Sequence, residues 1–181
     1  IASFVYFEDP VMPGRMHKGF DHWGYWNQDG DDLIGCPFVP IGGIHPDFGT
    51  GRASDLVRTR AQSLKSIHYP GGGSKEIVYE LHQGKLRDQP MMMIGGGLRV
   101  ERILERDAPG SKPAEYRYTY EGGVVYAERF NYQLSAYNTP GTIVDYSISS
   151  HCQSAINDFY DSPVVYSSVT ERLPNGSSVK Y

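Results

Sequence analysis

The sequence predicts a mostly β fold, in which antiparallel hairpins or a meander form a twisted sheet or a sandwich-like layer. The 181 residues include 14 tyrosines, and 13% of all residues are aromatic, a class enriched in strands. The 21 glycines and 12 prolines provide many tight turns. From Lys65 onward, apolar and polar residues alternate with the two-residue period of a strand.

Length and charge limit the classes of function. A chain of 181 residues is consistent with one domain spanning residues 1–181. The net charge is −4 and there is no run of Lys and Arg, so nucleic acid is not an expected partner. No apolar run approaches about 18 residues, so no membrane span is expected.

The first 50 residues are predicted to form an irregular, loop-rich part. Prolines and glycines recur there too often for a long helix. One short helix is predicted near residues 52–64, with Ser54 as its N-cap ahead of Asp55. The side chains expected to pin the irregular part or to line the helix face are Phe38, Val39, Ile41, Ile44, Leu56, Val57, Ala61 and Leu64.

The stretch KSIHYPGGGSKEIVYELHQG predicts a β-hairpin over residues 65–84. Glycines at 71–73 supply the positive φ angles that its turn requires. On the return strand Ile77, Tyr79 and Leu81 share one face, and Glu76 and Glu80 are expected to point to water.

The next segment, MMMIGGGLRVERILER, predicts a strand with a break in its alternation. Leu98 and Val100 lie on one face, but Ile103 falls on the other. A β-bulge near Arg102 would restore the phase.

A second hairpin is predicted over AEYRYTYEGGVVYAERFNYQLSAY. Tyr116, Tyr118 and Tyr120 share a face, and Gly122–Gly123 are expected to turn the chain. Val124, Tyr126 and Phe130 would then lie on the returning strand. Further strands are predicted at residues 142–148, 163–171 and 177–181, and the last two would be joined by Pro174–Gly176.

The order of these motifs resembles a known family. FDHWGYWN, SIHYPGGGSKEIVYE, GGGLRVERILERD, YRYTYEGG and VVYSSVTERLPNG follow one another over roughly residues 20–181. This succession is similar to that of large exported RHS-like or YD-repeat-like proteins of Gram-negative bacteria. The resemblance implies a β-rich scaffold in an exported protein, periplasmic or at the cell surface. No regular repeat of roughly 20 residues recurs, so the chain departs from the usual repeat array.

Because the chain starts at Ile1, just before the apolar run FVYF, and has no initiator Met, we expect it to be a fragment or mature segment of a longer protein. The strand-like ends at Ser3–Phe7 and Val179–Tyr181 would be open edges that pair with neighbouring segments or another protein. Cys36 and Cys152 would form a disulfide in an exported protein or remain two buried thiols.

The stretch FDHWGYWNQDGDD, residues 20–32, is the candidate ligand site. If Gly30 is the EF-hand glycine, Tyr25 and Cys36 occupy two positions that require oxygen ligands. The stretch is therefore not expected to be an EF-hand. Asn27, Asp29 and Asp31 would form a looser calcium site or a polar turn, and we favour the turn because Asn, Asp and Gly are the residues that turns prefer. No metal or cofactor is assigned.

The same stretch has an aromatic reading. Trp23, Tyr25 and Trp26 would offer a face on which a glycan stacks, with Asp29, Asp31 and Asp32 binding its hydroxyls. The opposing reading, which we favour, makes both tryptophans core anchors. A 50-residue irregular segment must bury large side chains to offset its ordering entropy.

Catalytic motifs are missing from the sequence. The six histidines form no HExxH, and neither GGG stretch has the Lys-Ser/Thr of a P-loop. Asp21 and His22 beside a serine or Cys152, or His151 beside Cys152, would be the residues of a hydrolase. We therefore predict a non-catalytic structural or interaction module, with a glycan-binding module as the alternative and a hydrolase third.

Overall fold

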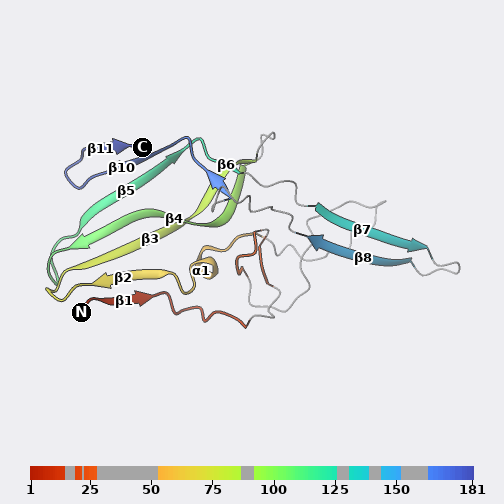
Figure 1. The fold of residues 1–181 in the computed structure, drawn as a ribbon, viewed down its shortest axis with the longest axis horizontal. Helices are drawn as coiled ribbons and strands as arrows, with labels where there is room; N and C mark the ends of the chain where they lie inside the picture. The colour runs from red at the N-terminus through yellow and green to blue at the C-terminus, as the bar shows by residue number, and fades with distance from the viewer. Residues whose placement is uncertain are drawn as a thin grey trace.

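The computed structural model describes residues 1–14, 19–21, 23–27, 53–86, 92–125, 131–138, 144–151 and 163–181. Within these ranges strands predominate and helix is limited to one turn, so the predicted fold class is confirmed (Figure 1). The elements are β1 (Ser3–Tyr6), α1 (Leu56–Thr59), β2 (Leu64–His68), β3 (Ser74–Leu86), β4 (Met92–Arg106), β5 (Ala114–Glu121), β6 (Val124–Val125), β7 (Asn131–Asn138), β8 (Val144–His151), β9 (Val164–Val165), β10 (Ser168–Arg172) and β11 (Ser178–Lys180).

The large sheet has the strand order β1-β2-β3-β4-β5-β10-β11, and every pair along this path is antiparallel. The described strands from the two ends of the chain, β1 and β11, are its outer strands, as Figure 1 shows. A separate two-stranded sheet pairs β7 with β8.

The first predicted hairpin is confirmed as β2 and β3. The backbone N–H of Tyr69 donates to the carbonyl of Gly73 at 2.9 Å, and that of Gly72 donates to Tyr69 at 3.0 Å. Gly72 has φ +87°, which is the left-handed geometry that the glycine run was expected to provide.

The predicted bulge is also present. Val78 pairs with Arg102 but Tyr79 pairs with Val100, so Glu101 is an extra residue in β4. This insertion restores the phase of the alternation, because directly paired residues lie on the same face of a sheet. The apolar pairs that result are Ile77 with Ile103, Tyr79 with Val100, and Leu81 with Leu98.

A second irregularity in β4 was not predicted. Leu81 pairs with Leu98, but Gln83 pairs with Ile94, so the three glycines 95–97 oppose the single residue His82. Their φ angles are +132°, +81° and +98°. We call this segment the glycine bulge. A residue with a side chain would be strained at each of these three positions, so glycine is required there.

The second predicted hairpin is wrong. The strand β5 does not pair with the segment after Gly122–Gly123 but with β4 and β10. The chain instead crosses to the far end of β3, where β6 pairs parallel with β3 and antiparallel with β9. Glycines permit this crossing, since a Cβ added to Gly84 would lie 2.8 Å from the carbonyl carbon of Gly123. Tyr126 and Phe130 lie outside the described residues.

The remaining strand predictions fall close to observed strands. The segment 142–148 corresponds to β8, 163–171 to β9 and β10, and 177–181 to β11. The turn between β10 and β11 is confirmed by the bond from the N–H of Leu173 to the carbonyl of Ser177 at 2.8 Å.

The helix is shorter than the predicted range and has a different cap. Asp55, not Ser54, is the N-cap of α1, and its carboxylate accepts the N–H of Arg58 at 2.8 Å. The hydroxyl of Ser54 instead donates to Asp21. Gln62 has φ +63° and Leu64 already belongs to β2, so the helix cannot extend to residue 64.

Few side chains are fully buried in the described part of the molecule. The buried apolar residues are Trp26, Ala61, Val125 and Val164, and the buried polar residues are Asp21, Asn27, Ser66 and Arg99. Phe38, Val39, Ile41, Ile44, Cys36 and Cys152 lie outside the described residues. Among the residues that the structure describes, Asp21 and Arg99 are the two charged ones that are buried, and a buried charge requires partners.

Candidate functional site: two buried charges beside the glycine bulge

The aromatic stretch forms a tight turn, which we call the aromatic hairpin (residues 19–21 and 23–27). The N–H of Asp21 donates to the carbonyl of Tyr25 at 2.8 Å, and the N–H of Asn27 donates to Gly19 at 3.0 Å. Phe20 and Trp26 form a β-bridge between the two sides. The described residues of this stretch thus form an ordered turn that includes Trp23 and Tyr25.

Asp21 organises this hairpin from inside. Its Oδ1 accepts the backbone N–H groups of Trp23 and Tyr25, both at 2.9 Å, and its Oδ2 accepts the hydroxyl of Ser54. An aspartate that binds backbone groups just ahead in the chain is a common turn element. Burial raises the pKa of the Asp21 carboxyl, and the bonds from Ser54, Tyr25 and Trp23 oppose that rise.

The glycine bulge receives the aromatic hairpin. A Cβ added to Gly97 would lie 2.7 Å from the hydroxyl of Tyr25, and one on Gly95 would overlap Ser54 and the ring of Trp23. The rings therefore occupy the space that side chains on β4 would otherwise need. Glycine is required here for close approach as well as for its backbone conformation.

The structure places four of the six predicted ligand residues in this hairpin. Trp26 is 4% exposed, with the Arg58 guanidinium 5.9 Å from its ring centroid, and the amide of Asn27 donates to the carbonyl of Ala53 at 2.9 Å. Tyr25 is 38% exposed. The ring of Trp26 is thus covered, whereas Tyr25 offers surface to solvent. The remaining predicted residues, Asp29 and Asp31, and also Asp32, lie outside the described residues.

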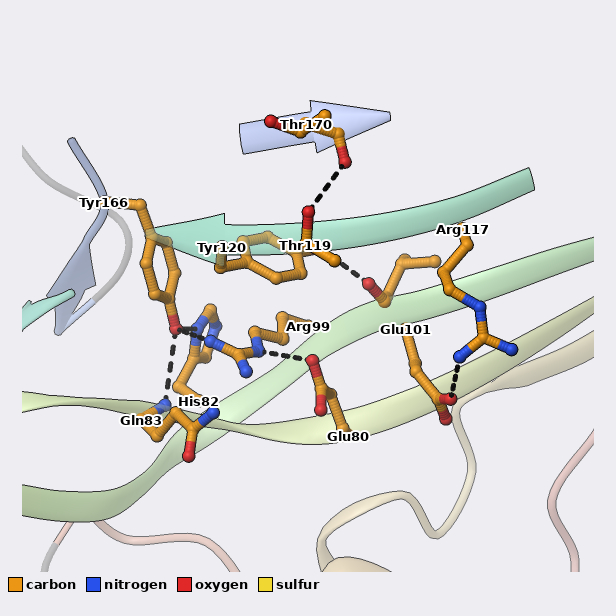
Figure 2. A network of polar contacts seen from close by, with 11 residues as sticks. Glu80, His82, Gln83, Arg99, Glu101, Arg117, Thr119, Tyr120, Tyr166 and Thr170 are labelled. Atoms are coloured by element: carbon orange, nitrogen blue, oxygen red, sulfur yellow. Dashed lines mark hydrogen bonds and ion pairs between the residues drawn. The ribbon is translucent and has the colours of Figure 1, made fainter. Parts of the chain in front are cut away.

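The second buried charge, Arg99, was not singled out by the sequence. Its Nε donates to Glu80 at 2.8 Å and its Nη1 donates to the hydroxyl of Tyr166 at 2.7 Å (Figure 2). The guanidinium also lies 4.4 Å from the ring centroid of Tyr120, within the range of a cation–π contact. Glu80, expected to point to water, is 34% exposed and pairs with this guanidinium.

The Tyr166 hydroxyl fixes the protonation of His82. It lies 2.7 Å from Nη1 of Arg99, 3.3 Å from the backbone N of Gln83 and 2.9 Å from Nδ1 of His82. A tyrosine hydroxyl has two acceptor positions and one proton. The two N–H groups can only donate and therefore fill the acceptor positions, so the proton points to His82, whose Nδ1 must be unprotonated.

His82 is accordingly a neutral base at pH 7. Burial, followed by the positive charge of Arg99, lowers its pKa from 6.5 to about 4, and a hydrogen bond to the backbone of Leu98 opposes the shift. Its ring stacks on that of Tyr166 with centroids 5.8 Å apart. His82 is the residue that opposes the glycine bulge, so the two clusters lie on adjoining parts of β3 and β4.

We call the group of Glu80, His82, Arg99, Tyr120 and Tyr166 the arginine cluster. Its contacts join residues 19, 67 and 84 positions apart in the sequence. In the sequence, Arg99 is only a charged residue within a predicted strand, a pattern that is typical of a solvent-exposed face and does not predict a buried cluster. The polar groups of Asp21 and Arg99 bind partners within the chain, and these contacts stabilise the hairpin turn and the packing of the strands.

Comparison with known proteins gives no further assignment. No protein-family model, curated protein or solved structure matches this chain. Within the described ranges, no group of three or more His, Cys, Asp and Glu side chains is arranged to hold a metal ion. A search of the same ranges finds no helix with the length and apolarity to cross a membrane.

Proposed function

We propose that this chain is a non-catalytic structural or interaction module of an exported or cell-surface protein similar to the RHS/YD-repeat proteins. Its role is to continue a β-sheet with a neighbouring segment or another protein. The observation that supports this proposal is the outer strand β1. All four of its residues are exposed, and three of them, Phe4, Val5 and Tyr6, are large and apolar.

The two outer strands differ in their protection. An uncharged, apolar edge strand is a template for pairing with another strand, whereas lysine on an edge opposes such pairing. The strand β11 carries Lys180, which pairs with Glu121 at 2.9 Å. The strand β1, SFVY, has no charge. The proposal therefore assigns the interaction to β1 rather than to β11.

Light scattering over a wide range of protein concentration tests this assignment, with a second copy of the chain as the partner. We expect the mass to rise with concentration, and we expect Phe4→Lys to abolish the rise because it places a charge on the edge. Val179→Lys on β11 is the matched control and should leave the mass curve unchanged. A chain that remains monomeric throughout, or that responds equally to both substitutions, would contradict pairing between copies through β1.

A glycan-binding module is the second candidate, and the exposure of Tyr25 favours it. In this reading Tyr25, which is 38% exposed, and the half-buried Trp23 would form the stacking surface, and the buried Trp26 would support them. Acrylamide quenching of tryptophan fluorescence, with and without polysaccharide, separates the candidates. Protection by polysaccharide that Tyr25→Ala removes would favour glycan binding over the scaffold role.

A further inference from the structure

We propose that the Tyr166 hydroxyl and the neutral His82 ring form an acid-released clasp, which fastens the β6–β9 end of the sheet onto β3 and β4. This inference goes beyond the proposed scaffold role and does not depend on pairing through β1. It rests on which atoms can donate and accept at a single hydroxyl.

The place of the clasp in the fold gives it a structural consequence. The chain leaves the large sheet at β6, includes β7 and β8, and returns at β9, and Tyr166 directly follows this return. The two-residue strands β6 and β9 hold each other through Val124 with Val165 and Val125 with Val164. Such short pairing provides few bonds, so the side chain of Tyr166 is a principal attachment of the returning segment to β3 and β4.

The attachment combines packing with hydrogen bonds. The ring of Tyr166 lies 4.8 Å from that of Tyr120 on β5, and a Cβ on Gly123 would lie 2.9 Å from the Tyr166 ring. Its hydroxyl reaches His82 and the backbone of Gln83 on β3 and Arg99 on β4. One hydroxyl thus ties the returning segment to two strands, as Figure 2 shows.

Protonation of His82 is incompatible with this arrangement. A protonated ring carries a hydrogen on Nδ1, so three N–H donors would point at a hydroxyl with two acceptor positions. The hydroxyl proton would also lose its acceptor. The charged groups that face the ring are Arg99 from β4, which repels an imidazolium, and Glu80, whose carboxylate is already paired with Arg99. The tyrosines that face it are Tyr120 from β5 and Tyr166 itself.

Hydrogen exchange of the segment 163–168 at pH 7 and pH 5, corrected for intrinsic rates, tests the clasp. With a folded pKa of about 4 against 6.5 for a free histidine, linkage predicts that protection falls by up to about 20-fold between these pH values. His82→Gln keeps an acceptor for Tyr166 but cannot be protonated, so its protection should change far less. His68→Gln is the matched control, because His68 is an exposed residue of β2 outside the arginine cluster, and this variant should behave as the unaltered protein does.

An NMR titration of the His82 ring provides a measurement that needs no variant. We expect the ring to titrate well below pH 6.5, and Tyr166→Phe to move the titration upward because the neutral ring loses its donor. A His82 ring that titrates near its ordinary value would overturn the clasp. Equal loss of protection in the unaltered protein and His82→Gln, or no loss in the unaltered protein, would overturn it as well.

Discussion

The aromatic hairpin and the arginine cluster both enclose a buried charge, but they find its partners at different distances along the chain. Asp21 takes two backbone N–H groups from residues two and four positions away. Arg99 depends on side chains 19 and 67 positions away. The first is a local turn with an anion at its centre, and the second exists only once β3, β4 and the segment after β9 have come together.

This difference predicts how each cluster fails. A local turn can form before the sheet does, so its loss should mainly affect the docking of residues 19–27. Removal of one member of a nonlocal cluster leaves groups on several strands without a partner, and these groups are only partly accessible to water. Substitutions in the two clusters should therefore lower the free energy of unfolding, measured by urea denaturation, by different amounts.

Arg99→Ala should have the largest effect. It leaves Glu80 and the Tyr166 hydroxyl without their shared donor and should cost about 3 to 4 kcal/mol. Arg117→Ala is the matched control on the adjacent strand, since Arg117 also contacts glutamates but is 44% exposed. It should cost less than about 1 kcal/mol. Equal costs for the two arginines would show that burial does not distinguish them.

Gly97→Ala should come next, at about 2 to 3 kcal/mol, because φ is +98° and the new Cβ would meet the Tyr25 hydroxyl. Gly110→Ala separates the two causes. Gly110 has φ +80° with nothing within 4 Å of an added Cβ, so only the backbone cost of about 1 kcal/mol should remain. If the two variants are equally destabilised, the aromatic hairpin does not pack on the glycine bulge.

The stability difference between Asp21→Asn and the unaltered protein should change with pH in the opposite direction from the difference for His82→Gln. The folded pKa of Asp21 is raised above 3.8. Its contribution to stability is therefore fully present below pH 3.8 and is lost as pH rises through the folded value. The asparagine variant lacks this contribution, so it should fall further behind the unaltered protein as pH is lowered toward 4.

His82 acts in the other sense because its folded pKa is depressed. Its contribution is complete above pH 6.5 and is lost as pH falls toward about 4. His82→Gln should therefore gain on the unaltered protein over the same acid range. Unfolding curves at pH 7, 5.5 and 4.5 measure both trends, and parallel trends in the two variants would contradict these assignments.

Ser54→Ala should have the smallest effect. It removes the hydroxyl that links Asp21 to the segment before α1 and should cost about 1 kcal/mol. In a double-mutant cycle with Asp21→Asn, the two costs should be non-additive because they share one contact. A cost comparable to that of Arg99→Ala would mean that the hairpin is held mainly by this nonlocal bond, contrary to the local picture.

Features with a short-range cause were predictable. The alternation after Lys65 and the glycines at 71–73 predicted β2, β3 and their turn, and the slip between Val100 and Ile103 predicted the bulge at Glu101. Each depends on residues close in sequence, where sterics and the two-residue period of a strand decide the outcome. The turn at residues 21–25 also has a local cause, because Asp21 binds backbone groups within four residues, but the sequence predicted a polar turn further along, at Asn27, Asp29 and Asp31.

Features with a long-range cause required the tertiary structure. The glycines at 122–123 suggested a hairpin, but β10 pairs with β5 through Tyr118 with Glu171 and Tyr120 with Val169, and β6 crosses to β3. The glycines at 95–97 did not predict that the rings of Trp23 and Tyr25 would pack against this part of β4. The partners of Arg99, His82 and Tyr166 are set by register between distant strands, and the two-residue period cannot specify which strands become neighbours. The sequence by itself therefore determined the strands and turns that have a local cause, whereas the strand order and the partners of Arg99 were decided only when the sheet assembled.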